Sequence, residues 1–396
     1  MDTVSQKTLG FDIYALDLQR CALLREGAEL QLRPKSFDVL RYLAEHPGRL
    51  VPKDELIQAV WPGIFVTDDS VVQCIREIRT AIRDDDHRII KTVARRGYLF
   101  AAELTGEEHG TRLPPAGSRS QDITFCRTED GVNLAVASIG QGLPVISTPT
   151  WATHLEYDWE SPTRARLWHY LADRFRLIRY DGRGFGLSDR AVADVSFPTR
   201  ERDLQTVADA LHLRRYGLLA ISGGAATAIA HAVCNPERVS RMVLHGGFAL
   251  GRKKRGSVKD AEMARAWTAI MRQGWGDDNS ALLRIFSSVW LPGASSEQIR
   301  WYANMLRVST SVENAIKTRT TSDEIDVVDL LPMVSVPTLV MHCRHDNAVP
   351  FDGGRRIAAA IPNAKLVSMD SENHVPLPDE PAWQTFVGEI EAFLMA

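Results

Sequence analysis

Five continuous apolar runs of strand length restrict the fold of this chain more than any other feature. They are LPVIST, FRLIRYD, YGLLAIS, RMVLHGG and PTLVMHCRHD, all after residue 140. Helical patterns lie between several of them, around 164–173, 199–211 and 225–234. Because strands that are apolar on both faces must be covered on both sides, this alternation predicts a mainly parallel sheet with helices packed against it.

A polar segment at 107–121, EEHGTRLPPAGSRSQ, divides the chain in two. It combines charged residues, Gly, Ser and a Pro-Pro pair with almost no apolar content, which is typical of an extended linker. We therefore expect a small domain at 1–105, a linker at 106–121 and a larger domain at 122–396.

Composition narrows the class of protein. With 44% hydrophobic and 24% charged residues the chain has the balance of a globular protein, and its net charge of −3 excludes a wholly basic DNA-coating protein. The start, MDTVSQKTLG, lacks a signal pattern, and no run approaches the roughly 18 apolar residues of a membrane span. The five cysteines are far apart, without metal-finger spacing. We expect a cytoplasmic protein with reduced thiols, no membrane contact, no metal and no cofactor.

The N-terminal part follows the order strands, three helices, hairpin. Two strand-like runs, FDIYALD and ALLREGAELQL, come first. The first helix begins at Arg33-Pro34 and places Phe37, Leu40 and Leu43 on one face, and the second runs from about 53 to 60. The capping residues TDDS at 67–70 announce the third, and IIKTVARRGYLFAAEL closes the segment as two strands around 95–97. This order is that of a winged helix.

The third helix combines a buried stripe with a row of arginines. Val71, Ile75, Ile78 and Ile82 recur at helical spacing and predict a face turned to the core. A helix of this kind can lie in a DNA major groove, with a positive wing on the phosphates. The predicted DNA-binding residues are Gln73, Arg76, Arg79, Arg83, Lys91, Arg95 and Arg96, with Arg88 adding charge. The alternative is a solvated helix face, partly neutralised by Glu77 and the acidic run 84–86.

Three stretches decide between these alternatives: LRPKSFDVLRYLAEHPGRLVPKDELIQAVWPG, DDSVVQCIREIRTAI and IIKTVARRGYLF. Over about residues 10–103 the chain resembles the winged-helix effector domain of OmpR/PhoB-type regulators. The resemblance implies binding to double-stranded DNA as a homodimer on paired half-sites. It also implies that the loop 61–65 can contact RNA polymerase, although its apolar content is equally consistent with core packing. In that family the domain normally follows a receiver domain, whereas here it comes first.

The run YGLLAISGGAATAIAHA predicts a strand, a tight turn at Ser222 and a helix of small residues. A serine on such a turn is exposed above the sheet, and the N–H of Gly223 and the helix N-terminus favour developing negative charge. The G-x-S-x-G pattern reads Ala220-Ile221-Ser222-Gly223-Gly224 here, so its first glycine is missing. Taken alone, this Ser-Gly-Gly turn is weak evidence for a nucleophile.

Two further residues complete a possible triad. Asp346 ends the strand-like run PTLVMHCRHD, and His374 follows LVSM, giving the chain order Ser, Asp, His. With YDGRGFGLSD at 180–189, these pieces resemble the α/β-hydrolase superfamily across most of 122–396. The resemblance implies that Ser222 is the nucleophile, Asp346 the acid and His374 the base. His342, His345 and Glu372 are weaker candidates for the acid and the base. The alternative for Asp346 and His374 is that they are ordinary loop residues.

The oxyanion side departs from the usual hydrolase pattern. A His-Gly pair normally follows the third strand, but the matching stretch here is Ser147-Thr148-Pro149-Thr150-Trp151. Pro149 has no N–H to donate, so the predicted oxyanion donors are Gly223 and Trp151. Since the loss of one donor typically costs on the order of 10²–10³ in rate, we expect good binding and slow turnover.

A helical, aromatic stretch at about 251–328 predicts a cap over the pocket. Most of its aromatic residues are expected in the cap core, and the predicted ligand-pocket residues are Trp151, His154, Trp267 and Trp290. The glycine-rich segment 182–186 fails the G-x-G-x-x-G spacing and predicts a turn after a strand, not a nucleotide loop.

Two functional hypotheses follow. In the first, the chain is a one-component transcription regulator whose hydrolase-like domain senses, and slowly hydrolyses, a small-molecule ligand: an ester, a lactone or a related carbonyl compound. In the second, it is an active, esterase-like serine hydrolase whose DNA-binding domain is autoregulatory. We favour the first, because the combination of the two domains accounts for both halves of the sequence.

Overall fold

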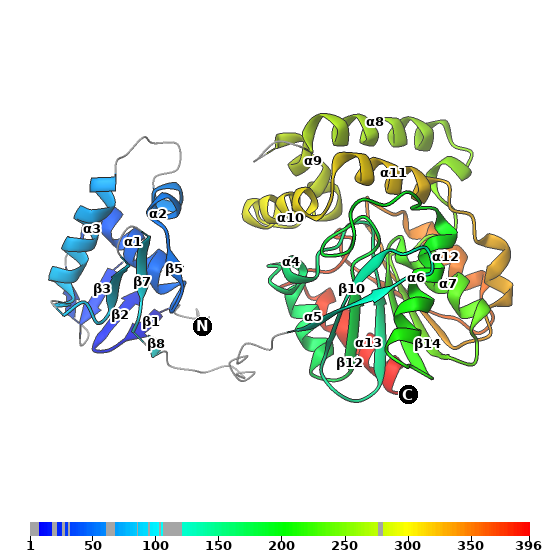
Figure 1. Ribbon diagram of the computed structural model, residues 1–396, viewed down its shortest axis with the longest axis horizontal. Helices are drawn as coiled ribbons and strands as arrows, with labels where there is room; N and C mark the ends of the chain where they lie inside the picture. The colour runs from blue at the N-terminus through cyan, green and yellow to red at the C-terminus, as the bar shows by residue number, and fades with distance from the viewer. Residues whose placement is uncertain are drawn as a thin grey trace. The chain divides into compact units, whose positions relative to one another are not determined.

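The computed structural model describes residues 8–17, 22–25, 28–30, 32–60, 68–84, 86–93, 96–102, 104–105, 121–275 and 280–396. The chain divides into two compact units, Met1–Gly117 and Ser118–Ala396. Each unit is drawn in Figure 1 and is described here by itself.

The first unit contains two small antiparallel sheets and three helices. The first sheet has the order β4-β3-β2-β1-β8, from β1 (Thr8–Phe11), β2 (Tyr14–Asp17), β3 (Ala22–Arg25), β4 (Ala28–Leu30) and β8 (Leu104–Thr105). The second has the order β5-β7-β6, from β5 (Leu50–Val51), β6 (Ile90–Val93) and β7 (Gly97–Phe100). Each of the two expected N-terminal strands is a hairpin, and the first turns at Asp12, whose φ is 51°.

Three helices cover these sheets: α1 (Pro34–Ala44), α2 (Lys53–Val60) and α3 (Asp68–Ala81). The predicted apolar stripes of α1 and α3 are both buried in one core, with Leu40 and Leu43 of α1 and Val71 and Ile78 of α3 fully inaccessible to solvent. Since burying such a side chain contributes roughly 1.5–3 kcal/mol, these two stripes hold the unit together. The expected order of strands, three helices and hairpin is confirmed.

An eight-stranded sheet forms the centre of the second unit, in the order β16-β15-β14-β13-β11-β12-β10-β9. Its strands are β9 (Asp122–Arg127), β10 (Asn133–Ile139), β11 (Pro144–Thr148), β12 (Arg176–Tyr180), β13 (Tyr216–Ile221), β14 (Val239–His245), β15 (Thr338–Cys343) and β16 (Lys365–Met369). The strands from β12 to β16 pair in parallel, whereas β9 and β10 form an antiparallel hairpin at one edge. The expected mainly parallel sheet is confirmed.

Helices cover both faces of this sheet (Figure 1). Residues of α5 (Ala165–Ala172) and α13 (Ala382–Met395) share one apolar cluster with the sheet. Residues of α6 (Phe197–Ala210), α7 (Gly224–Cys234) and α12 (Phe351–Ala360) share the other. A short helix, α4 (Leu155–Trp159), follows β11. Because the sheet is buried on both sides, its strands are continuous apolar runs, which is why the sequence marks them so clearly.

A helical cap is inserted between β14 and β15 and lies above the sheet in Figure 1. It comprises the 3-10 turn η1 (Arg252–Lys254), α8 (Val258–Gly274), α9 (Ala281–Trp290), α10 (Ser296–Ser309), α11 (Val312–Asp323) and the 3-10 turn η2 (Val328–Met333). Ser257, Ser280, Ser295 and Ser311 cap the starts of the four helices with their side chains. Among the described helices, none has the length and apolar character to cross a membrane.

Candidate functional site

Ser222 lies on the turn between β13 and α7, in a strained conformation. Its φ is +57°, which a non-glycine residue adopts only when its surroundings impose it, and its N–H donates to His245 O at 2.9 Å. The glycine at 224 permits a close approach, because a Cβ on Gly224 would lie 2.8 Å from Pro149 O and would overlap Thr148. The turn therefore presents Ser222 at the carboxyl edge of the sheet, as a nucleophile elbow requires.

Asp346 and His374 are hydrogen-bonded to each other. His374 Nδ1 lies 2.6 Å from Asp346 Oδ2, and both residues are buried. Asp346 Oδ1 accepts from the N–H groups of Ala348 at 2.8 Å and Val349 at 3.0 Å. Burial alone would raise the pKa of Asp346, but the imidazoles of His374 and His342 and these backbone donors hold it well below its usual range. The carboxylate is therefore charged and fixes the orientation of the His374 ring.

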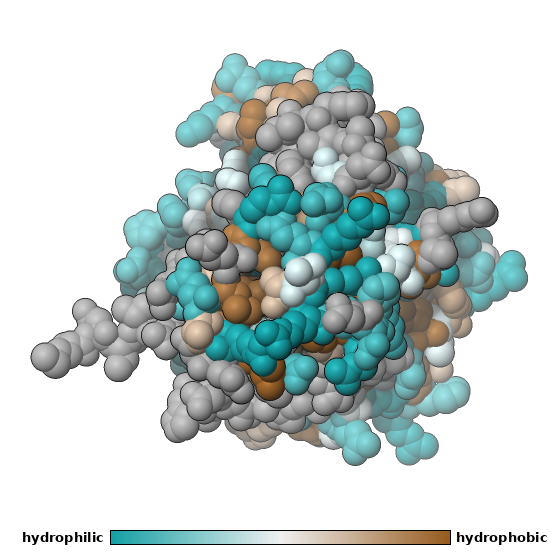
Figure 2. Space-filling model, turned by 90° about the vertical axis from the view of Figure 1, so that its left-hand side faces the viewer, coloured by the Kyte–Doolittle hydropathy of each residue, from teal (hydrophilic) through white to brown (hydrophobic). Residues whose placement is uncertain are grey.

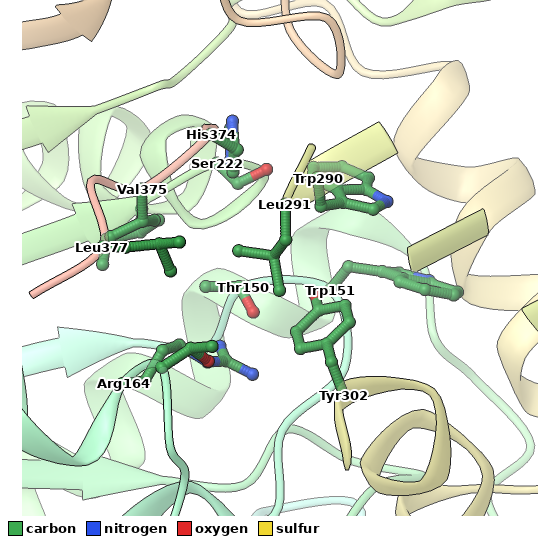
Figure 3. A pocket seen from close by; sticks show the side chains of 12 residues that line it. Thr150, Trp151, Arg164, Ser222, Trp290, Leu291, Tyr302, His374, Val375 and Leu377 are labelled. Atoms are coloured by element: carbon green, nitrogen blue, oxygen red, sulfur yellow. The ribbon is translucent and has the colours of Figure 1, made fainter. Parts of the chain in front are cut away.

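The other nitrogen of His374 is available for a proton. Nε2 is buried and has no hydrogen-bond partner in the described part of the chain. Ser222 and His374 line the same cavity, and Figure 3 shows both side chains at its wall. The structure thus brings the three residues of the predicted triad to one site, with a base nitrogen that faces no competing partner among the described residues.

The weaker candidates for the acid and the base, His342, His345 and Glu372, have other positions and partners. His342 is buried and its Nε2 is 2.9 Å from Val349 O, so it helps to hold the loop that carries Asp346. His345 is exposed and pairs with Asp370 at 3.2 Å, and Glu372 is also exposed. None of the three takes the place of Asp346 or His374.

His245 is a residue of this site that the sequence did not single out. It ends β14, is fully buried, and its Nε2 lies 2.7 Å from His374 O. Burial, and then repulsion from His374, lowers the pKa of His245 to about 3, so the ring is neutral at ordinary pH. The contact with His374 O holds the backbone of His374, the predicted base, in place. Its only signal in the sequence is a polar residue at the end of an apolar strand, which is too common to be informative.

The two predicted oxyanion donors lie next to each other. A Cβ on Gly223 would be 3.8 Å from Thr150 O, so the loop after β11 packs on the turn at Ser222. No described residue accepts a hydrogen bond from the backbone N–H of Gly223 or of Trp151. Neither N–H group is thus occupied by an acceptor of the described residues, which an oxyanion hole requires, and Pro149 has no N–H to contribute.

A largely apolar pocket adjoins Ser222; its empty space of about 580 Å³ includes space that is open to solvent. Two of the predicted pocket residues, Trp151 and Trp290, line it from the sheet side and from the cap (Figure 3). The rest of its lining is Thr150, Thr163, Arg164, Ile221, Ser222, Leu291, Tyr302, His374, Val375 and Leu377. The mostly apolar lining suits a ligand with an apolar part.

The other two predicted pocket residues lie elsewhere. Trp267 packs edge-on against Phe286 in the core of the cap, with ring centroids 5.0 Å apart. His154 is buried at the start of α4, and its ring is 5.0 Å from that of Tyr157. Neither is part of the cavity wall described above.

The glycine-rich segment 182–186 forms a turn around a buried carboxylate. Gly186 has a φ of +53°, and a Cβ there would overlap Asp181 Oδ2. That oxygen accepts from the N–H of Leu187 at 2.9 Å and of Leu155 at 3.2 Å. Burial raises the pKa of Asp181 to about 6. The glycines serve this turn, as the sequence predicted.

On the first unit, α3 and the strand that follows it expose most of the predicted DNA-binding side chains. Figure 2 looks at this side and shows hydrophilic residues gathered across the middle of the face. The exposed residues are Gln73, Arg76, Arg83, Arg88, Lys91 and Arg96. None of these cations pairs with a carboxylate in the described part of the chain, whereas Arg95 and the loop 61–65 lie outside the described residues.

Arg79 differs from its neighbours on α3. Its terminal nitrogen donates to Ile90 O at 2.6 Å and to Thr92 Oγ1 at 2.9 Å, both on β6. It therefore fixes α3 to the first strand of the wing, in addition to any contact with phosphate.

Two of the acidic residues expected to neutralise this face, Glu77 and Asp84, have other partners, whereas Asp86 is exposed and Asp85 lies outside the described residues. Glu77 pairs with Arg33 at 2.5 Å and accepts from Ser36 at 2.9 Å, on α1 and its cap. Asp84 is buried and accepts from the N–H groups of Ile89 and Ile90. The positive face of α3 is thus not cancelled by these two carboxylates, which weakens the alternative of a merely solvated helix.

Two family models match the chain, one in each unit. Residues 27–100 match the model described as transcriptional regulatory protein, C terminal, and residues 144–381 match the model described as alpha/beta hydrolase fold. Over 100 residues the chain is 37% identical to the transcriptional activator CadC of Escherichia coli. This match covers 23% of the chain and 20% of that relative, so it concerns the first unit alone.

The second unit resembles both curated and solved hydrolases. It is 31% identical over 204 residues to a 2-hydroxy-6-oxononadienedioate/2-hydroxy-6-oxononatrienedioate hydrolase of Cupriavidus pinatubonensis, covering 50% of this chain and 68% of that relative. The crystal structure of a hydrolase from Pseudomonas aeruginosa superposes with a TM-score of 0.57 at 26% identity. That superposition covers 71% of this chain and 100% of the other.

Proposed function

We propose that this chain is a one-component, ligand-responsive transcription regulator. The chain belongs to the α/β-hydrolase fold family and carries a transcriptional-regulator DNA-binding domain before its hydrolase domain. A small carbonyl compound, such as an ester or a lactone, binds in the cavity beside Ser222 and changes the affinity of the first unit for double-stranded DNA. The proposal rests on this pocket, which lies between the sheet and the cap of the second unit. The same chain carries α3, with exposed arginines at Arg76 and, just after the helix, Arg83.

The site supports a carbonyl group as the feature that is recognised. In this proposal a carbonyl oxygen bound beside Ser222 accepts from the N–H groups of Gly223 and Trp151, and the packing of the loop at Thr150 against Gly223 supports this placement. The C. pinatubonensis relative is named as a hydrolase of an oxo acid, which also favours a carbonyl compound. In this proposal the protein acts in the cytoplasm, binds DNA as a homodimer, and communicates with RNA polymerase from its first unit.

A second function, slow hydrolysis of the bound compound, is favoured by the Asp346–His374 hydrogen bond. His374 Nε2 takes the proton of Ser222 Oγ as the hydroxyl attacks the carbonyl carbon, and Asp346 stabilises the imidazolium that forms. The negative oxygen of the intermediate rests on the N–H groups of Gly223 and Trp151. His374 returns the proton to the leaving group, and a water molecule then releases the acyl group by the same steps. Hydrolysis of this kind would end the signal.

The test compares wild-type protein with Ser222→Ala. Each full chain is titrated with a duplex that the wild type selects from a random-sequence pool, with and without a panel of aryl esters, lactones and ketones. We expect at least one compound to change the DNA affinity of both proteins, by roughly 5- to 150-fold, the usual range of such coupling. If no compound changes DNA affinity although one binds to the cavity, the regulator proposal fails.

The time course separates the two functions. If the triad is a working catalyst, the wild-type response decays as the compound is consumed, whereas that of Ser222→Ala persists. A wild-type response that persists as long as that of the variant would reject hydrolysis and leave regulation in place.

A further inference from the structure

A second cavity lies beside Ser222 and differs from the first, because three arginines line it, whereas the first has one, Arg164, which pairs with Asp158 at 2.8 Å. Its empty space of about 410 Å³ includes space open to solvent, and its wall contains Arg252, Arg255 and Arg319. The other lining residues are Trp151, Ser222, Gly223, Phe248, Trp290, Ser322, Asp323, Ala348 and Val349. Trp151, Ser222 and Trp290 border both cavities, so the two lie side by side at the predicted nucleophile.

The arginines of this second cavity are held in place by the surrounding chain. Arg252 donates to Ala348 O at 3.0 Å, and Arg255 donates to Leu250 O at 3.1 Å. The Arg319 guanidinium lies 6.0 Å from the ring centroids of both Trp151 and Trp290. Removing a guanidinium group from water costs free energy unless the group is paired with an anion or fully hydrogen-bonded.

The charges in the second cavity do not balance. Arg319 is 7% exposed and its nearest carboxylate is Asp323, whose oxygen lies 3.6 Å from Nε. Arg255 is 3.8 Å from Asp260 on α8. Arg252 pairs with no carboxylate of the described residues, and its NH1 nitrogen is buried with no partner in the described part of the chain. Of the three arginines, Arg319 and Arg255 each lie within 4 Å of a carboxylate, Asp323 in the cavity wall and Asp260 outside it, which leaves the charge of Arg252 for a ligand to neutralise.

The pKa values agree with this geometry. Burial, and then repulsion from Arg319, lowers the pKa of Arg252 to about 10, and burial also lowers those of Arg255 and Arg319. All three remain charged at neutral pH, in surroundings that an anion would improve.

We propose that the second cavity binds a carboxylate group, so that the ligand of this protein is a carboxylic acid with a carbonyl group at Ser222 and an apolar group in the first cavity. The single unbalanced charge suits a monoanionic group, and the planar fork of Arg252 can bind a carboxylate with two hydrogen bonds. This inference rests on the proposed function, because it takes the ligand to bind at Ser222, and it narrows the ligand from carbonyl compounds in general to oxo acids and acid esters.

The test uses 4-benzoylbutyrate, which has a carboxylate, a ketone and a phenyl ring, and its neutral methyl ester. Binding to the full-chain Ser222→Ala protein is measured by calorimetry without DNA, so the result is independent of both turnover and DNA binding. We expect the acid to bind at least 10-fold more tightly than its ester. Arg252→Gln keeps a polar side chain but loses the charge, and should weaken the acid roughly 10- to 100-fold while changing the ester less than about 2-fold.

Arg272→Gln, an exposed arginine on α8 of the same cap, is the matched control and should change neither affinity. Arg319→Gln should repeat the selective loss. Equal affinities of acid and ester, equal weakening of both by Arg252→Gln, or no binding of either compound would overturn the inference. Tighter binding of phenyl phosphate than of the acid would also overturn the assignment to a carboxylate. If the acid binds but does not alter DNA affinity, the regulator proposal fails while this inference stands.

Discussion

Two arginines three residues apart on α3 should respond to substitution in opposite ways. Arg76 is exposed and pairs with no carboxylate in the described part of the chain, so it is free to contact DNA. Arg79 donates two hydrogen bonds to β6, to Ile90 O and to Thr92 Oγ1. We predict that Arg79→Ala destabilises the first unit, whereas Arg76→Ala leaves its stability unchanged and weakens DNA binding.

The size of each effect follows from the bonding of the two side chains. A hydrogen bond from a charged donor is worth roughly 1.5–3 kcal/mol when buried, and since Arg79 is partly exposed, its two bonds together should contribute about 2 kcal/mol. Amide hydrogen exchange in α1 and α3 of the full chain should then become about 30-fold faster in Arg79→Ala. For Arg76→Ala, an exposed substitution, the change should stay below about 0.5 kcal/mol, or roughly 2-fold in rate.

DNA binding supplies the opposite readout. A side chain that neutralises one phosphate contributes about 0.9 to the slope of log affinity against log salt, so Arg76→Ala should make this slope shallower by about that amount. The reasoning is refuted if Arg76→Ala speeds exchange as much as Arg79→Ala does. It is also refuted if Arg79→Ala leaves exchange unchanged, because its bonds to the wing would then contribute nothing.

Three further predictions concern the second unit. Asp346→Asn should lower any ester hydrolysis by about 10⁴-fold, because the amide no longer orients the His374 imidazole as a base, while calorimetry should find ligand affinity within a few-fold of wild type. Gly186→Ala should cost at least roughly 2 kcal/mol in urea unfolding, since its Cβ overlaps Asp181 at positive φ, whereas Gly388→Ala in α13, with open space around it, should not destabilise. Burial lowers the pKa of His245 from 6.5 to about 3, so below pH 6.5 the unfolded chain binds a proton that the folded chain does not. The free energy of unfolding should therefore be highest above pH 6.5 and should fall by up to roughly 4–5 kcal/mol as the pH falls from 6.5 toward 3. A free energy of unfolding that does not decline over that window would contradict the assignment.

The sequence predicted the elements of both units because their signals are local. The apolar stripe of α3 and the continuous apolar strands of the sheet depend only on spacing along the chain, and each was buried as expected. Splitting of the first strand-like run into a hairpin was missed, because Asp12 adopts positive φ without a glycine to signal it.

Partners of charged side chains were the least predictable feature. Glu77 and Asp84 stand beside the arginines in the sequence, yet they bond to α1 and to the backbone before the wing. A helix face can be inferred from periodicity, but a partner across the core depends on how helices and strands pack. For the same reason, sequence position alone could not distinguish Arg79 from Arg76.

The sequence by itself determined two folds, a tight strand–helix turn at Ser222 and a basic helix, since each is encoded within a few consecutive residues. Only the tertiary structure decided what surrounds Ser222. His245 reaches the base from a neighbouring strand, and Arg252 and Arg319 come from opposite ends of a cap that folds back over the sheet. Residues separated by such an insertion meet only through packing, and no pattern along the chain records the distance between them.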